Sequence, residues 1–302
     1  MIVRNITKPI DVTLEQVSEL LIASTPTNQP RRPTLKSPLR YPGGKSRAVK
    51  QILHLLPPNL DRLCSPFVGG GSVELACAAR GVEVHAYDAF APLVNFWQVL
   101  LEDAPKLAQL VRAYHPLNKV EFYALQRGYF TLKGRRKLAA VFFALNRSSF
   151  SGTTLSGGMS PGHPRFTDTA IVGLAAFKTD RLTIKQADFK QSLGRHKHDF
   201  LYLDPPYVIA SKLYGKRGDH HADFDHAALA KILRKRDGWL LSYNDCPAVR
   251  ELYDGFCILS SKWAYGMNAS RQSNEVFVLS ADYANVFSDV FNPQNQRGLF
   301  DE

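Results

Sequence analysis

Cysteines and long apolar runs are both scarce in this sequence. The chain of 302 residues has four cysteines, and no two of them form a CxxC pair or show the spacing of a zinc finger. No apolar run reaches the roughly 18 residues that a membrane span needs. The first residues also lack the basic-then-apolar layout of a secretory signal. We therefore expect a cytoplasmic protein with reduced cysteines and no membrane contact.

Acidic residues are also few relative to basic ones. The chain has 38 Lys and Arg against 27 Asp and Glu, a formal charge of +11 and an isoelectric point near 9.5. This balance suggests a polyanionic partner. Between residues 104 and 150, nine Lys and Arg are opposed by one acid, Glu121. A solvated helical face explains the lysines but not the lack of acids, so we favour a nucleic-acid-binding segment.

The rest of the sequence alternates short β-rich runs with helical stretches, which is typical of a parallel α/β sheet. We expect a mostly parallel sheet that ends in an antiparallel hairpin. Its strands are expected at residues 62–64, 83–87, 182–185, 199–203, 239–242, 256–260 and 275–280. No strand is expected between residues 92 and 170. A helix is expected at residues 11–22 and a polar tail after Tyr283.

A glycine-rich loop and an acid indicate a nucleoside-binding half of the sheet. The Phe-Val-Gly-Gly-Gly run at residues 67–71 follows the first strand and precedes a helical run at residues 72–79. Its backbone can therefore approach a ligand closely at a helix N-terminus. Asp88 ends the next strand, where a carboxylate can accept both ribose hydroxyls. This pattern alone does not separate S-adenosylmethionine from NAD.

The run Asp204-Pro205-Pro206-Tyr207 directly follows an apolar strand. Ligands of open α/β sheets bind beyond the carboxyl ends of the strands, and two prolines hold this turn rigid. The amino group of adenine is a poor nucleophile because its lone pair is delocalised into the ring. The Asp204 carboxylate and the Pro205 carbonyl could accept both N–H bonds, and Tyr207 could stack on an extruded base. The turn therefore favours S-adenosylmethionine as the cofactor.

Several motifs together resemble the Dam-type, D12 class of DNA adenine-N6 methyltransferases, over about residues 35–283. Besides the Asp204 turn, the similar stretches are residues 39–45 (Leu-Arg-Tyr-Pro-Gly-Gly-Lys), 65–71, 187–189 (Ala-Asp-Phe), 241–245 (Leu-Ser-Tyr-Asn-Asp) and 146–152 (Asn-Arg-Ser-Ser-Phe-Ser-Gly). The resemblance implies a class I S-adenosylmethionine-dependent methyltransferase fold, which is α/β and Rossmann-like. It also implies an inserted helical target-recognition domain that binds double-stranded DNA.

The composition and the resemblance together give the chain a domain plan and a set of site residues. The plan has an N-terminal extension and linker at 1–34, a catalytic domain at 35–90 and 171–283, the target-recognition domain at 91–170, and a flexible tail at 284–302. The cofactor-binding residues are expected to be Tyr41, Lys45, Phe67, Gly69, Gly71, Asp88, Asp188 and Asp204. The catalytic residues are expected to be Asp204, Pro205, Pro206 and Tyr207. The DNA-binding residues are expected to be Arg127, Lys133, Arg135, Arg136, Lys137, Asn146 and Arg147.

Two positions depart from the family pattern. The family usually has an acid where this chain has Ser65, and often a tryptophan where it has Tyr41. Neither change removes a catalytic group, but the first could weaken cofactor binding.

We expect direct in-line attack by a flipped base, with no covalent intermediate and no metal. Displacement at a sulfonium carbon needs no metal, and the histidines show no HExxH spacing. Cytosine C5 methylation would need a cysteine in a Pro-Cys motif, whereas Cys246 precedes its proline. The alternatives are an RNA adenine-N6 or DNA cytosine-N4 methyltransferase, and a catalytically silent nucleic-acid-binding protein on the same fold.

The C-terminal run from Gln296 to Phe300 is similar to the pentapeptide with which bacterial polymerases and repair proteins bind the replicative sliding clamp. Leu299 and Phe300 would enter an apolar pocket while Gln296 hydrogen-bonds at its rim. Alternatively, the two apolar side chains fold back onto the catalytic domain. We expect a labelled peptide of residues 292–302 to bind purified clamp with micromolar affinity, and Leu299→Ala with Phe300→Ala to remove the binding. Equal binding by the double variant would contradict a clamp motif.

Overall fold

The computed structural model describes residues 35–161, 165–208, 224–264 and 272–284. Within these ranges the strands form one seven-stranded sheet of order β3-β2-β1-β4-β5-β7-β6. The strands are β1 Arg62–Ser65, β2 Glu83–Asp88, β3 Leu182–Gln186, β4 Phe200–Leu203, β5 Trp239–Asn244, β6 Cys257–Ala264 and β7 Gln272–Leu279. Neighbours from β3 to β5 pair in parallel, and β7 lies antiparallel to β5 and β6. The expected fold class is therefore confirmed, with each strand within a few residues of its predicted place.

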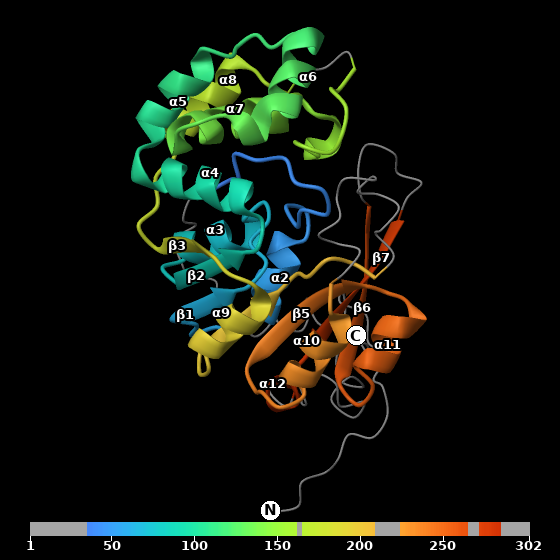
Figure 1. Cartoon of the computed structure of the whole chain (residues 1–302). Coiled ribbons are helices and arrows are strands. Elements are labelled where there is room, and N and C mark those ends of the chain that lie inside the picture. Colours follow the sequence, from blue (N-terminus) through green and yellow to red (C-terminus); the bar gives the residue numbers. More distant parts are fainter. Residues whose placement is uncertain (1–34, 162–164, 209–223, 265–271, 285–302) are drawn as a thin grey trace, which may run out of the picture.

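Helices cover both faces of the sheet (Figure 1). They are α2 Val49–Leu55, α3 Ser72–Ala79, α4 Ala91–Glu102, α5 Ala104–Arg112, α6 Lys119–Gly128, α7 Arg135–Ser148, α8 Asp168–Ala175, α9 Phe189–Arg195, α10 His226–Leu233, α11 Pro247–Leu252 and α12 Ala281–Ala284. Successive strand residues alternate between the faces. In β4, Tyr202 joins the apolar cluster under α2, α3 and α4, whereas Leu201 and Leu203 join the cluster under α9, α10 and α11. The apolar strands are thus buried on both sides, as a parallel sheet requires.

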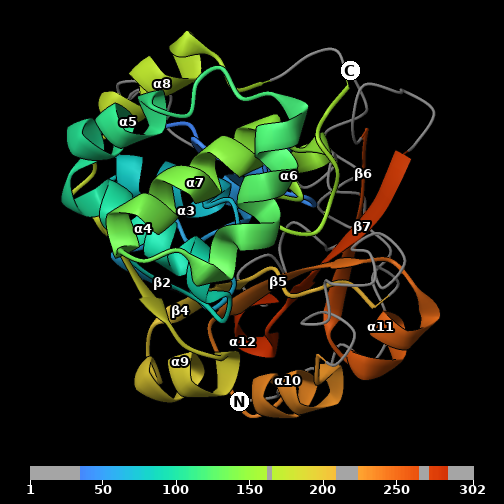
Figure 2. The ribbon, with the colours of Figure 1, turned by 45° about the horizontal axis from the view of Figure 1, so that its top comes forward.

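The segment between β2 and β3 is helical, as the sequence predicts, and its described residues contain no strand. Helix α4 packs against α7, and α5 packs against α7 and α8, so these helices gather at one end of the molecule (Figure 2). The middle of α7 is an apolar run that is completely buried, and its Phe143 ring stacks on Phe96 of α4 at 5.9 Å. The buried α7 side chains belong to the same apolar cluster as the face of the sheet that α2, α3 and α4 cover. Helix α8 spans the expected domain boundary at residue 170 and packs with the other inserted helices.

The strand order places a topological switch between β1 and β4. From β1 the chain runs to β2 and β3 on one side, and from β4 to β5 on the other. The carboxyl ends of these two central strands therefore lie at the edge of the sheet where open α/β sheets bind ligands. The glycine loop follows β1 and the Asp204 turn follows β4, so the fold brings the two motifs to the same place.

The expected helix at residues 11–22 and the tail with Gln296, Leu299 and Phe300 lie outside the described residues. Among the helices that are described, none combines the length and apolar character that crossing a bilayer needs.

Candidate active site

The glycine loop after β1 packs against an aromatic side chain from the segment before α2. Gly69 and Gly71 have φ values of +46° and +67°, in the left-handed region that favours glycine. A Cβ atom on Gly69 or Gly70 would lie 2.9 Å or 2.8 Å from atoms of the Tyr41 side chain. The Trp97 indole donates to the Gly69 carbonyl at 3.1 Å. The glycines therefore permit the close approach of Tyr41, and Gly71 likewise leaves room for the Trp97 ring at the start of α3.

Asp88 ends β2 beside this loop. Its carboxylate accepts hydrogen bonds from the backbone N–H groups of Gly69 at 3.1 Å and Phe90 at 2.9 Å. Burial raises the pKa of Asp88, and the two N–H groups oppose that rise. A carboxylate has about four lone-pair positions, so Asp88 can fix the loop and still accept hydroxyl groups.

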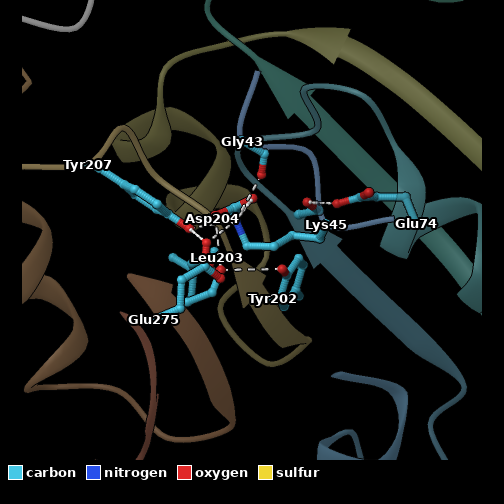
Figure 3. A network of polar contacts seen from close by, with 10 residues as sticks. Gly43, Lys45, Glu74, Tyr202, Leu203, Asp204, Tyr207 and Glu275 are labelled. Carbon is cyan, nitrogen blue, oxygen red and sulfur yellow. Dashed lines mark hydrogen bonds and ion pairs between the residues drawn. The ribbon is translucent and has the colours of Figure 1, made fainter. Parts of the chain in front are cut away.

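The Asp204 turn contains a buried ion pair with Lys45. The Lys45 ammonium lies 2.7 Å and 2.9 Å from the two carboxylate oxygens of Asp204. It also donates to the Tyr207 hydroxyl at 2.6 Å and the Gly43 carbonyl at 3.1 Å. The Lys45 side chain is 2% exposed and that of Asp204 is 21% exposed. Figure 3 shows Asp204, Tyr207 and Glu275 around the Lys45 ammonium. The Lys45 side chain is therefore buried, whereas part of the Asp204 carboxylate is reachable from solvent.

Glu275 of β7 is a second carboxylate in this network, and it is not among the residues expected from the sequence. It accepts a hydrogen bond from the Tyr207 hydroxyl at 2.5 Å and lies 3.6 Å from the Lys45 ammonium. Ser242 of β5, equally unexpected, donates to Asp204 at 3.0 Å. Ser242 belongs to the stretch at residues 241–245 that resembles the family. For Glu275 the sequence offers no signal beyond an acid at the start of an apolar strand.

Glu74 of α3 is a third buried carboxylate nearby. It is 2% exposed and accepts a hydrogen bond from the Ser65 hydroxyl at 2.6 Å. Burial raises its pKa from an ordinary value of 4.5 to about 7, and the charge of Asp204 adds to that rise. Ser65, which replaces the acid usual in the family, thus has a carboxylate as its partner.

Asp188 and Phe67, two of the expected cofactor-binding residues, contact side chains and backbone outside the Asp204 network. Asp188 is exposed and caps α9, where its carboxylate accepts the Gln191 N–H at 2.8 Å. The Phe67 ring lies 6.2 Å from that of Phe189 and 5.5 Å from that of Phe224. In the described part of the chain, no three His, Cys, Asp or Glu side chains are grouped so that they could hold a metal ion.

The cationic residues expected to bind DNA lie mostly at the two ends of α7. Arg135, Arg136 and Lys137 are exposed in its first turn, and Arg135 is paired with Glu102 at 2.7 Å. Arg147 is half-buried roughly 18 Å further along, at a rise of about 1.5 Å per residue. The remaining two, Arg127 and Lys133, are exposed.

Asn146 is expected to contact DNA, but the structure buries its side chain completely. The amide oxygen accepts the Arg40 N–H at 2.9 Å, and the amide nitrogen donates to the Arg40 carbonyl at 2.7 Å. The same nitrogen donates to the Gly152 carbonyl and to the Thr154 hydroxyl. Asn146 therefore ties the loop that leads to Lys45 onto the end of α7, which is a positioning role.

A group of three arginines surrounds this junction, and only Arg147 among them is expected from the sequence. Arg40 donates to the Ser149 carbonyl at 3.1 Å, and Arg147 donates to the Arg165 carbonyl at 2.9 Å. Burial lowers the pKa of Arg147 to about 10, with the charges of Arg40 and Arg165 adding to the effect. Within the described residues no carboxylate forms an ion pair with any of the three. The junction thus has unbalanced positive charge.

Several known proteins are similar to this chain in sequence. The sequence profile of the D12 class N6 adenine-specific DNA methyltransferases matches residues 41–267. A type II methyltransferase of Lactococcus lactis, M1.LlaDCHI, is 21% identical over 82% of this chain and 95% of its own length. The DNA N-6-adenine-methyltransferase of Escherichia phage P1 is 28% identical over 72% of this chain and 31% of its own length. The DNA adenine methylase of Serratia marcescens is 26% identical over 71% of this chain and 86% of its own length.

These matches define the class of protein. The profile covers most of the chain, and its boundaries enclose both the glycine loop and the Asp204 turn. The chain belongs to the D12 class of N6 adenine-specific DNA methyltransferases. The family assignment favours adenine N6 in DNA over the RNA and cytosine-N4 alternatives.

We expect the buried Glu74 to give the protein a measurable pH dependence of stability. Its pKa is about 7 in the folded protein and near 4.5 when exposed, so the folded state keeps a proton that the unfolded state has lost. The stabilising contribution is complete below about pH 4.5 and is lost as the pH rises to about 7. Urea unfolding of the wild type and Glu74→Gln at pH 5 and pH 8 should show the variant gaining relative stability on the order of 1–3 kcal/mol. An unchanged difference between the two proteins would show that Glu74 does not titrate in this window.

Proposed function

We propose that the protein transfers a methyl group from S-adenosylmethionine to N6 of a flipped adenine in double-stranded DNA, by direct in-line attack. The observation that carries the proposal is the partly exposed Asp204 carboxylate at the end of β4, on a turn with two prolines and Tyr207. It lies at the topological switch of the sheet, where ligands bind.

The cofactor would bind across the carboxyl ends of β1 and β2. The residues present fit a nucleoside, because residues 69–71 carry no side chains of their own and Asp88 has acceptor capacity beside them. Tyr41, Gly69, Gly71 and Asp88 would hold it, with Phe67 and Asp188 further along the same edge of the sheet. S-adenosylmethionine supplies an electrophilic methyl group on a sulfonium sulfur.

The Asp204 carboxylate and the Pro205 carbonyl would accept hydrogen bonds from the two N–H groups of the adenine amino group. This direction of hydrogen bonding shifts electron density onto N6, and the lone pair becomes available for attack. Tyr207 would stack against the extruded base. The proton is lost from N6 after transfer, so the site needs no tuned general base.

The inserted helices would hold the DNA. The exposed cations of α6 and of the first turn of α7 suit phosphate contacts, which supply affinity without sequence information. The cluster of Arg40, Arg147 and Arg165 adds positive charge beside the loop that carries Lys45. The exposed cations on these helices support the expected target-recognition domain at residues 91–170.

Asp204→Ala should abolish methyl transfer, because the acceptor that frees the N6 lone pair is gone. The fold and much of the DNA affinity should remain. Transfer of labelled methyl groups from S-adenosylmethionine to DNA and to RNA measures the activity and the preferred nucleic acid together. Tyr207→Ala serves as the comparison and should cost less, since stacking on a base is worth about 1–3 kcal/mol. Activity of Asp204→Ala within about tenfold of the wild type would refute its role.

Arg136→Gln with Lys137→Gln should weaken DNA binding by a similar factor for all sequences. It should also reduce the slope of log affinity against log salt, by about 0.9 for each phosphate that the protein no longer neutralises. Arg112→Gln is the matched control, because Arg112 is an inserted-helix arginine already paired with Asp168 at 2.8 Å. Fluorescence anisotropy over a salt series measures both slopes. If the double variant keeps the wild-type slope, the first turn of α7 is a solvated surface.

A further inference from the structure

Glu275 is a buried carboxylate at the centre of the site rather than at its edge. It lies opposite Asn244 in the antiparallel register of β7 and β5, and it is 1% exposed. Burying a carboxylate is costly unless charged or hydrogen-bonding groups compensate it. Two groups that compensate Glu275 here, the Tyr207 hydroxyl and the Lys45 ammonium, also contact Asp204 or belong to its turn.

The Lys45 ammonium has more acceptors around it than it has protons. An ammonium carries three N–H donors. Two oxygens of Asp204, the Tyr207 hydroxyl and the Gly43 carbonyl all lie within 3.1 Å, and Glu275 lies at 3.6 Å. Lys45 can therefore exchange one partner for another with little movement.

The proposed reaction needs one such exchange. Lys45 is bound to both oxygens of Asp204, and Ser242 donates to one of them. An adenine amino group must use an oxygen of the same carboxylate. An ammonium on that carboxylate withdraws the electron density that the amino group would receive, so the Asp204 of this structure is a weakened acceptor.

We infer that Glu275 is a positioning residue that receives the Lys45 ammonium when the target adenine binds Asp204. Closing the 3.6 Å separation to hydrogen-bond distance leaves Lys45 neutralised within the core. The Tyr207 hydroxyl, which donates to Glu275, keeps the ring in place during the exchange. The inference rests on the proposed function, because it concerns the same adenine amino group.

The test first requires that the wild type methylates adenine in DNA, and sequencing of the methylated DNA locates the target site. Two duplexes are then compared, one with the target adenine and one with purine, which lacks the exocyclic amino group, in its place. Their affinities are measured in the presence of S-adenosylhomocysteine. The ratio of the two dissociation constants reports the hydrogen bonds of the amino group, and the difference between protein variants cancels the change in base pairing.

Glu275→Gln should reduce this preference for adenine about 10- to 100-fold, the range expected for a hydrogen bond to a charged group. It should also lower kcat. The matched control is Glu74→Gln, another buried glutamate, which hydrogen-bonds Ser65 and acts on Lys45 only through its charge. The control should keep the wild-type ratio. Glu275→Asp retains the charge and should keep most of the preference, which provides a readout if Glu275→Gln folds poorly.

Variants that lack Lys45 distinguish a change of partner by the Lys45 ammonium from a general loosening of the site. In a Lys45→Met background no ammonium competes for Asp204, so adding Glu275→Gln should change the ratio less than about twofold. Two results would overturn the inference: a wild-type ratio in folded Glu275→Gln, whether or not both duplexes bind more weakly, or the same effect with and without Lys45. If the wild type transfers no methyl group to DNA, the proposed function itself fails, and that outcome is seen before any variant is made.

Discussion

One buried ammonium group, that of Lys45, balances the carboxylates around which this site is built. Asp204 is paired with it directly, Glu275 lies within ion-pair distance, and burial holds the pKa of Glu74 near neutrality. Without Lys45, the Asp204 and Glu275 carboxylates would lose the cation that both can reach. Removing the cation from such a cluster destabilises the folded state. The position of the loop that carries Lys45 is therefore the central constraint of the molecule.

That loop is fixed by the inserted helices and not by the sheet alone. Asn146 at the end of α7 binds both backbone groups of Arg40, and Gly152 lies so close that a Cβ there would be 2.1 Å from the Arg40 carbonyl. The segment that carries the positive charge and the segment that carries Lys45 thus share one junction. Arg147 donates to the Pro38 carbonyl at 3.5 Å, so it lies beside the start of the segment that leads to Lys45. Under the proposed function, DNA held by Arg147 would therefore lie next to that segment.

Much of this arrangement can be predicted from the sequence, because it depends on local patterns. The strands have apolar runs, Asp88 stands at the end of one of them, and the Asp204 turn follows another. The insert is evident from its lack of strands and of acids. The interactions that cannot be predicted depend on distant pairing. Glu275 reaches the site because β7 enters the sheet antiparallel beside β5, and no local pattern specifies which strand end it will face. Asn146 has a polar side chain in a basic segment. Only the folded structure shows that its amide group is hydrogen-bonded to Arg40, Gly152 and Thr154 and is not available to DNA.

The departure at Ser65 shows how the charge balance is kept when one acid is missing. A carboxylate at that position would stand in the core next to Glu74, and two buried acids in contact cannot both ionise. The serine hydroxyl instead donates to Glu74 at 2.6 Å and leaves one carboxylate there, with a pKa that burial raises to about 7. The negative charge near Lys45 is therefore divided between Asp204 and Glu275, the two groups that the lysine can reach. An active site that depends on a lysine changing partners requires that no third, fully charged acid compete for it, and the Ser65–Glu74 pair meets that requirement.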